Sequence, residues 1–114
     1  MHRVHYAGGS VLTGDAIASA LLEYAAALGR HATSATVEIP VREDDGERGI
    51  AQVLVGPASQ FVSVHEPDAL GEIEDGDLVE WFATATRELA PVTGSPLFDG
   101  ESVVPGDDFD TPEY

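Results

Sequence analysis

The chain has 114 residues, of which 43% are apolar, so it is long enough for one folded domain with a single core. It carries 21 acidic residues against five arginines and no lysine, and the resulting formal charge of -16 argues against direct binding to nucleic acid or to an anionic membrane surface. The chain contains no cysteine, which excludes disulfides, thiol nucleophiles and thiolate metal sites.

The cellular location is predicted from two features of the sequence. No apolar stretch approaches the roughly 18 residues that a membrane-spanning helix needs. The start, Met1-His2-Arg3, lacks the apolar region of a secretory signal. We therefore expect a cytoplasmic protein, and the lysine-free, alanine- and glycine-rich composition is typical of GC-rich bacteria.

The first predicted elements are a strand pair and a long helix. In residues 3–7, apolar and polar side chains alternate, as they do in a half-buried strand. Gly8-Gly9 suits a two-residue hairpin turn, and residues 10–12 are expected to form the return strand. A helix is predicted next, because apolar residues recur at helical spacing and form one stripe: Ile17, Leu21, Tyr24 and Leu28. Thr13 or Asp15 is expected to cap its start and Gly29 to end it.

Three further strands are predicted after this helix. Residues 36–42 alternate cleanly, but Pro40 lacks the N–H that a ladder needs, so this strand is expected at an edge of the sheet, at least around that residue. Residues 43–48 form a charged turn. Residues 50–55 are apolar on both faces apart from Gln52, which favours a more central strand, and residues 61–65 form the last strand.

A second helix is expected from Asp77, because Asp77 and Glu80 have the spacing of a capping box. Its apolar stripe repeats the spacing of the first helix and consists of Leu78, Phe82, Ala85 and Leu89. Trp81 is expected in the core beside this stripe. Two helices with matching stripes can cover one face of a sheet. The sequence thus predicts a two-layer α+β fold with a mostly antiparallel sheet of four to five short strands, in the order β-β-α-β-β-β-α.

The domain is expected to comprise residues 1–90, and residues 91–114 to form an acidic tail rich in proline and glycine. The tail holds six carboxylates and no basic residue, so the first 90 residues keep a formal charge of -10. Apolar residues lie between these acids, and such islands can dock on a partner or on the protein's own sheet. The candidate partner-binding residues are Leu97, Phe98, Asp99, Asp107, Asp108 and Phe109.

No catalytic, cofactor or metal site is predicted. The glycine-rich stretch before the first helix matches neither the dinucleotide nor the P-loop pattern, and Asp15 there would repel an anion. His2 and His5 would point to opposite faces of a strand, which disfavours a shared metal; the roles of His31 and His65 stay open. The serines sit where turns or strands explain them, without a nucleophile-elbow motif.

The charge suggests the function. We expect a non-catalytic interaction module whose acidic surface engages a basic partner protein, in the manner of an inhibitor or a nucleic-acid mimic. One alternative is a structural subunit of a larger assembly, or a homo-oligomer, that uses the tail and an edge strand. Another is a small-ligand binder or an enzyme with a pocket between helix and sheet.

Overall fold

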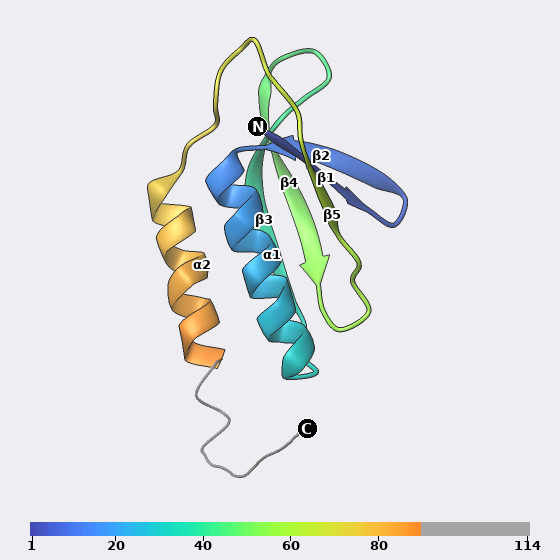
Figure 1. Ribbon diagram of the computed structural model, residues 1–114, viewed down its shortest axis with the longest axis vertical. Coiled ribbons are helices and arrows are strands. Elements are labelled where there is room, and N and C mark those ends of the chain that lie inside the picture. The colour runs from blue at the N-terminus through green and yellow to red at the C-terminus, as the bar shows by residue number, and fades with distance from the viewer. Residues whose placement is uncertain (90–114) are drawn as a thin grey trace.

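The computed structural model describes residues 1–89, which form five strands and two helices in the predicted order. Along the chain these elements are β1 (His2–Tyr6), β2 (Gly9–Thr13), α1 (Asp15–Arg30), β3 (Ala35–Arg42), β4 (Arg48–Val55), β5 (Val62–His65) and α2 (Gly76–Leu89). The helices lie side by side on one face of the sheet (Figure 1). The predicted α+β fold is therefore confirmed. Neither of these helices is long and apolar enough to cross a membrane.

The sheet is antiparallel and consists of two firmly paired parts. Its strand order is β4-β3-β2-β1-β5. β1 pairs along its length with β2 on one side and with β5 on the other, while β3 and β4 form a second ladder over all eight of their residues. Between these parts, β2 and β3 share only the pair Leu12–Arg42. We call this narrow junction the β2–β3 seam.

Two strands take positions that differ from the prediction. β4 is an edge strand rather than a central one, and its Ile50 and Leu54 are exposed because the helices cover only the other face of the sheet. β3 has a neighbour on each side, although Pro40 suggests an edge. Pro40 lies where β2 has already separated from β3, so its missing N–H costs no ladder bond. Its carbonyl accepts a hydrogen bond from Thr13 Oγ1 at 2.7 Å.

The first hairpin turns one residue earlier than predicted. Ala7 and Gly8 form the turn, and Gly9 already pairs with Tyr6 in the ladder. Only Gly8 has a positive φ, of 91°, so the turn does not need glycine at two positions.

Helix α1 buries the predicted stripe, but its ends differ from the prediction. The N-cap is Gly14, which offers no side chain, and Thr13 is buried in its bond to Pro40. The backbone N–H of Asp15 instead donates to Glu72 Oε2 at 2.5 Å, so a residue far along the chain completes the helix start. At the other end, Ala32 rather than Gly29 adopts a left-handed conformation, with a φ of 51°.

Helix α2 begins one residue before the predicted position. Asp75 Oδ1 accepts a hydrogen bond from the Leu78 N–H at 3.1 Å, so Asp75 caps this helix in place of Asp77. Phe82 is fully buried, whereas Trp81 is 51% exposed, so the prediction that Trp81 lies in the core is wrong. Successive residues on a helix point about 100° apart, and Phe82 takes the direction toward the core.

The core lies between the helices and the covered face of the sheet. Its buried members come from both helices, from β2, β3 and β4, from Met1 and from the segment before α2; they include Leu12, Ile17, Leu21, Ile39, Val55, Ile73 and Phe82. Ile73 anchors the long connection between β5 and α2 to this core. The connection is therefore held in place although it contains no regular structure.

Candidate binding groove and acidic end

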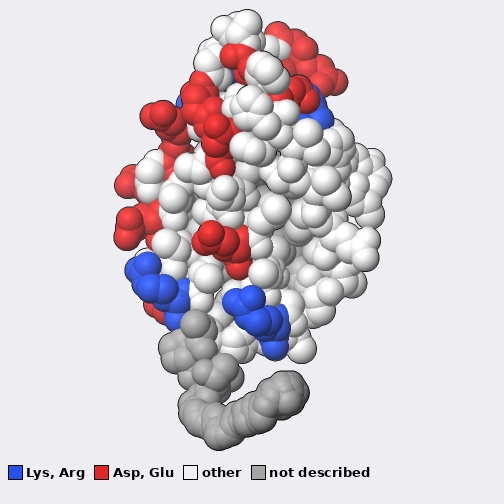
Figure 2. All heavy atoms as spheres, in the orientation of Figure 1, with Lys and Arg blue, Asp and Glu red and all other residues white. Residues whose placement is uncertain are grey.

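The carboxylates are concentrated at one end of the molecule. Nine of the fifteen acidic residues in residues 1–89 lie in the β3–β4 turn (43–47) and in the β5–α2 connection (66–75), which together we call the acidic end. The two segments contact each other, because Arg42 donates to the carbonyl oxygens of Gly46 and Gly71. Figure 2 shows acidic side chains gathered at the top of the molecule and along α2, with a large uncharged area at the right.

Ion pairs fix part of the acidic end to the sheet. Arg3 donates two hydrogen bonds to Glu66, at 2.8 and 2.9 Å, and this interaction lowers the pKa of the Glu66 carboxyl. The pKa of Asp68 is lowered by a hydrogen bond from the backbone N–H of Leu70 and by Arg42 at 3.3 Å. Both anchoring arginines come from strands, so these two carboxylates are structural.

The start of α1 holds a second charged cluster. The amino group of Met1 lies 2.9 Å from Asp15 and 3.0 Å from Glu72. Its hydrogen bond to Asp15, with a second contact from His2 at 2.5 Å, lowers the pKa of the Asp15 carboxyl. These contacts join β1, α1 and the connection.

Other carboxylates of the acidic end have no cationic partner in the described part of the chain. Glu43, Asp44, Glu47 and Glu74 are exposed and make no ion pair there. Residues 90–114 contain no arginine, lysine or histidine that could neutralise them. The acidic end thus presents free negative charge on a framework fixed by Arg3, Arg42 and Ile73.

A groove lies on the other side of the molecule from this charge. It is a hollow of about 730 Å³ between the end of β4, the loop that follows it, the start of β5 and the end of β1. Its walls are formed by His5, Tyr6, Ala7, Ser34, Gln52, Val53, Leu54, Gly56, Pro57, Ala58, Ser59, Gln60, Phe61 and Val62. Not one of these residues is acidic or an arginine, although the chain as a whole has a formal charge of -16.

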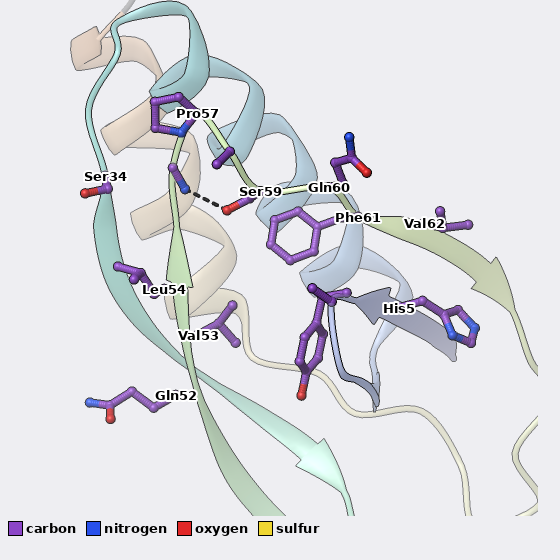
Figure 3. A pocket seen from close by; sticks show the side chains of 14 residues that line it. His5, Ser34, Gln52, Val53, Leu54, Pro57, Ser59, Gln60, Phe61 and Val62 are labelled. Atoms are coloured by element: carbon purple, nitrogen blue, oxygen red, sulfur yellow. Dashed lines mark hydrogen bonds between the residues drawn. The ribbon is translucent and has the colours of Figure 1, made fainter.

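The groove runs along the free edge of β4. Side chains of Gln52, Val53 and Leu54 alternate in direction, so all three can border one hollow only if it follows the edge of the strand. In Figure 3, Val53 and Phe61 point toward the hollow from two sides, and Gln52 and Leu54 lie on the other side of β4. β4 and β5 are the outermost strands, so the sheet must curl to bring both to the same hollow.

The groove contains few groups suited to catalysis. Ser59 Oγ accepts the backbone N–H of Gly56 at 2.9 Å and thereby fixes the loop after β4. The remaining polar side chains are neutral amides and hydroxyls together with His5. The Glu66 carboxyl interacts with His5 electrostatically, but within residues 1–89 no carboxylate forms a hydrogen bond with His5. His5 therefore lacks the hydrogen-bonded orienting partner that general-base catalysis generally uses. The arrangement suits binding through shape, apolar contact and backbone hydrogen bonds.

The four histidines, all within residues 1–89, are not gathered at one place. Within residues 1–89, no group of three histidine, aspartate or glutamate side chains is arranged to hold a metal ion. His2 contacts Asp15 and the ring of His65, whereas His5 lines the groove. His31 caps the end of α1. The first free N–H of α1, where an anion could bind, is occupied by Glu72.

The predicted partner-binding residues of the tail, Leu97 to Asp99 and Asp107 to Phe109, lie outside the described residues. Sequence reasoning missed the groove, because its residues come from four separated segments and carry no motif. It also missed Glu72 as the partner of the α1 start.

Comparison with family models, with curated proteins and with solved structures finds no match to this chain.

Proposed function

We propose that the protein is a non-catalytic interaction module that engages a basic partner protein through its acidic end. The observation that carries this proposal is the set of free carboxylates held at one end of the fold, among them Asp44, Glu47 and Glu74. Complementary potentials accelerate encounter and discriminate against partners of the wrong charge. Such a surface suits an inhibitor of a basic protein or a mimic of nucleic-acid charge, acting in the cytoplasm.

The rigidity of the acidic end supports the proposal. The ion pairs of Arg3 and Arg42 and the burial of Ile73 hold the connection against the sheet before any partner arrives. A preorganised surface loses less conformational entropy on binding than a flexible acidic tail does. Carboxylates present only for solubility would not need this framework.

The test compares two triple variants with equal change in charge. Asp44→Asn, Glu47→Gln and Glu74→Gln neutralise the acidic end, while Glu23→Gln, Glu80→Gln and Glu88→Gln neutralise exposed helical positions. Binding of a lysine homopeptide and of proteins captured from lysate is measured at low and high salt. We expect the triple variant of the acidic end to weaken binding about fivefold or more relative to the helical triple variant. High salt should abolish binding of the unmodified protein.

Equal effects of the two triples would show that only net charge matters and would overturn the assignment of the acidic end. Binding that persists at high salt would overturn the electrostatic mechanism itself.

A second candidate function is that of a structural subunit. The observation that favours it is the outer edge of β4, which no strand within residues 1–89 pairs with and where Ile50 is 66% exposed. A subunit of this kind would assemble through that edge, and sedimentation of the purified chain would reveal self-association that a charged substitution at Ile50 removes.

A further inference from the structure

We propose that the groove binds an extended, uncharged and largely apolar peptide segment of a partner protein, which joins the sheet as a strand beside β4. This inference does not depend on the basic partner of the proposed function, because it concerns a different surface and a different physical force. The two proposals can therefore fail separately.

The backbone of β4 supplies the recognition. β4 pairs with β3 on one side, and in the described residues no strand pairs with its other side. In an antiparallel ladder, every second residue directs both its N–H and its C=O away from the paired neighbour. A peptide laid along the groove can satisfy these groups, which is how sheet edges bind extended segments.

The length of the groove sets the length of the peptide. Three residues of β4 border it, corresponding to about 10 Å of strand. Beyond them, the loop at Gly56–Phe61 closes one end. The groove thus takes a segment of about three to five residues, with apolar side chains meeting Val53 and Phe61.

The absence of charge in the groove selects the occupant. A charged side chain placed there would lose hydration without gaining a counter-charge, because no lining residue is acidic or an arginine. The chain's own tail fits less well, because its two uncharged runs, residues 91–98 and 102–106, contain prolines, which lack the N–H that pairing with β4 needs. Its other apolar residue, Phe109, is flanked by Asp108 and Asp110. A second copy is disfavoured by repulsion between two chains that each have a formal charge of -16. A segment from another protein meets these conditions.

The first experiment identifies the peptide class. Full-length protein is immobilised and used to select from a displayed library of linear peptides at high salt, with the Leu54→Glu variant as the counter-target. We expect the enriched peptides to share an uncharged apolar core of a few residues. No enrichment over the variant, or enrichment of charged cores, would overturn the proposal.

The second experiment tests for strand pairing. Each backbone nitrogen of one enriched peptide is methylated in turn, and affinity is measured by isothermal titration. A strand hydrogen-bonded to β4 uses the N–H of every second residue, so affinity should fall at least about tenfold at alternate positions and little between them. A pattern without this period of two would exclude pairing with β4.

Matched substitutions locate the site. Leu54 and Ile50 point to the same face of β4 and are 69% and 66% exposed, but only Leu54 lines the groove. We expect Leu54→Glu to weaken binding of the enriched peptide at least about tenfold and Ile50→Glu less than about threefold. Because both side chains are exposed, both variants should fold. Equal effects would place the peptide elsewhere.

Two other occupants give distinct results. If the tail fills the groove, the double variant Leu97→Ser and Phe98→Ser will shift the amide resonances of Gln52 to Leu54 in the free protein and tighten peptide binding. If a second copy fills it, the free protein will sediment as a dimer that Leu54→Glu dissociates. Either result would overturn the proposal.

Discussion

The acidic end and the groove differ in every physical respect, although one strand connects them. β4 begins beside the turn that carries Asp44 and Glu47, and it ends where Val53 and Leu54 line an uncharged hollow. Over eight residues the surface changes from carboxylates to apolar side chains and a backbone edge that no described strand pairs with. A formal charge of -16 therefore describes no single surface of this protein.

The two regions are also stabilised differently. Ion pairs and Ile73 hold the acidic end, whereas two hydrogen bonds between Gly56 and Ser59 and the curl of the sheet shape the groove. Perturbations of the helix layer should affect both regions, and perturbations of an anchor should affect one. Substitutions in the helix layer and at single anchors test this difference.

Phe82→Ala should destabilise both regions together. Phe82 is fully buried and packs against Tyr24, with ring centroids 5.5 Å apart, so truncation should cost about 3–5 kcal/mol. Urea unfolding followed by circular dichroism measures this loss. Trp81→Ala on the same helix is the control and should cost less than half as much, because Trp81 is half exposed. Similar losses would contradict the assignment of Phe82 as the core anchor of α2.

Gly14→Ala should loosen the acidic end and spare the groove. A Cβ at Gly14 would collide with the backbone carbonyl oxygen of Ile73, so the connection must move, at a cost of about 1–3 kcal/mol. Amide resonances should shift in residues 66–75 and stay unchanged in residues 52–62. In Gly29→Ala a Cβ meets open space within α1, so this control should gain about 0.5–1 kcal/mol. Shifts spread evenly over both segments would show that the regions are coupled.

Acidification should weaken the ion pairs of the acidic end and of the α1 start, with a smaller effect on stability. Folding lowers the pKa of Asp15, Glu66 and Asp68, so their contribution to stability is fully present above their unfolded pKa of roughly 4 and is lost as pH falls through the folded values. The unfolding free energy should therefore decrease below about pH 4.

Glu66→Gln isolates one part of this effect. It removes the ionisable partner of Arg3, so stability at neutral pH should fall modestly and its decline in acid should become shallower. An unchanged acid slope would mean that the Arg3–Glu66 pair contributes nothing to the pH dependence.

Most of the fold could be predicted because local periodicity determines it. The stripe of Ile17, Leu21 and Leu28 predicts α1, and the alternation of Val37, Ile39 and Val41 predicts β3. Some errors occurred where a distant residue replaced a local signal. Glu72 completes the start of α1 in place of Thr13 or Asp15, and the spacing of residues 13–15 gives no sign of a partner more than fifty positions away.

The two surfaces were predictable to different degrees. The free carboxylates of the turn are evident in the sequence, because charged residues around Gly46 seldom pack inside a protein. The groove could not be predicted, since it depends on the curl that brings β4 near β5 and no local pattern encodes this curl. The apolar run at residues 50–55 predicts burial on two faces, but the helices cover only one face of the sheet, so Ile50 and Leu54 are exposed.

The β2–β3 seam has a kinetic consequence. Since Leu12–Arg42 is the only residue pair across it, most amides on the facing sides of these strands lack the protection of a ladder. Native-state hydrogen exchange should therefore be faster along this junction than in β1, which is paired on both sides.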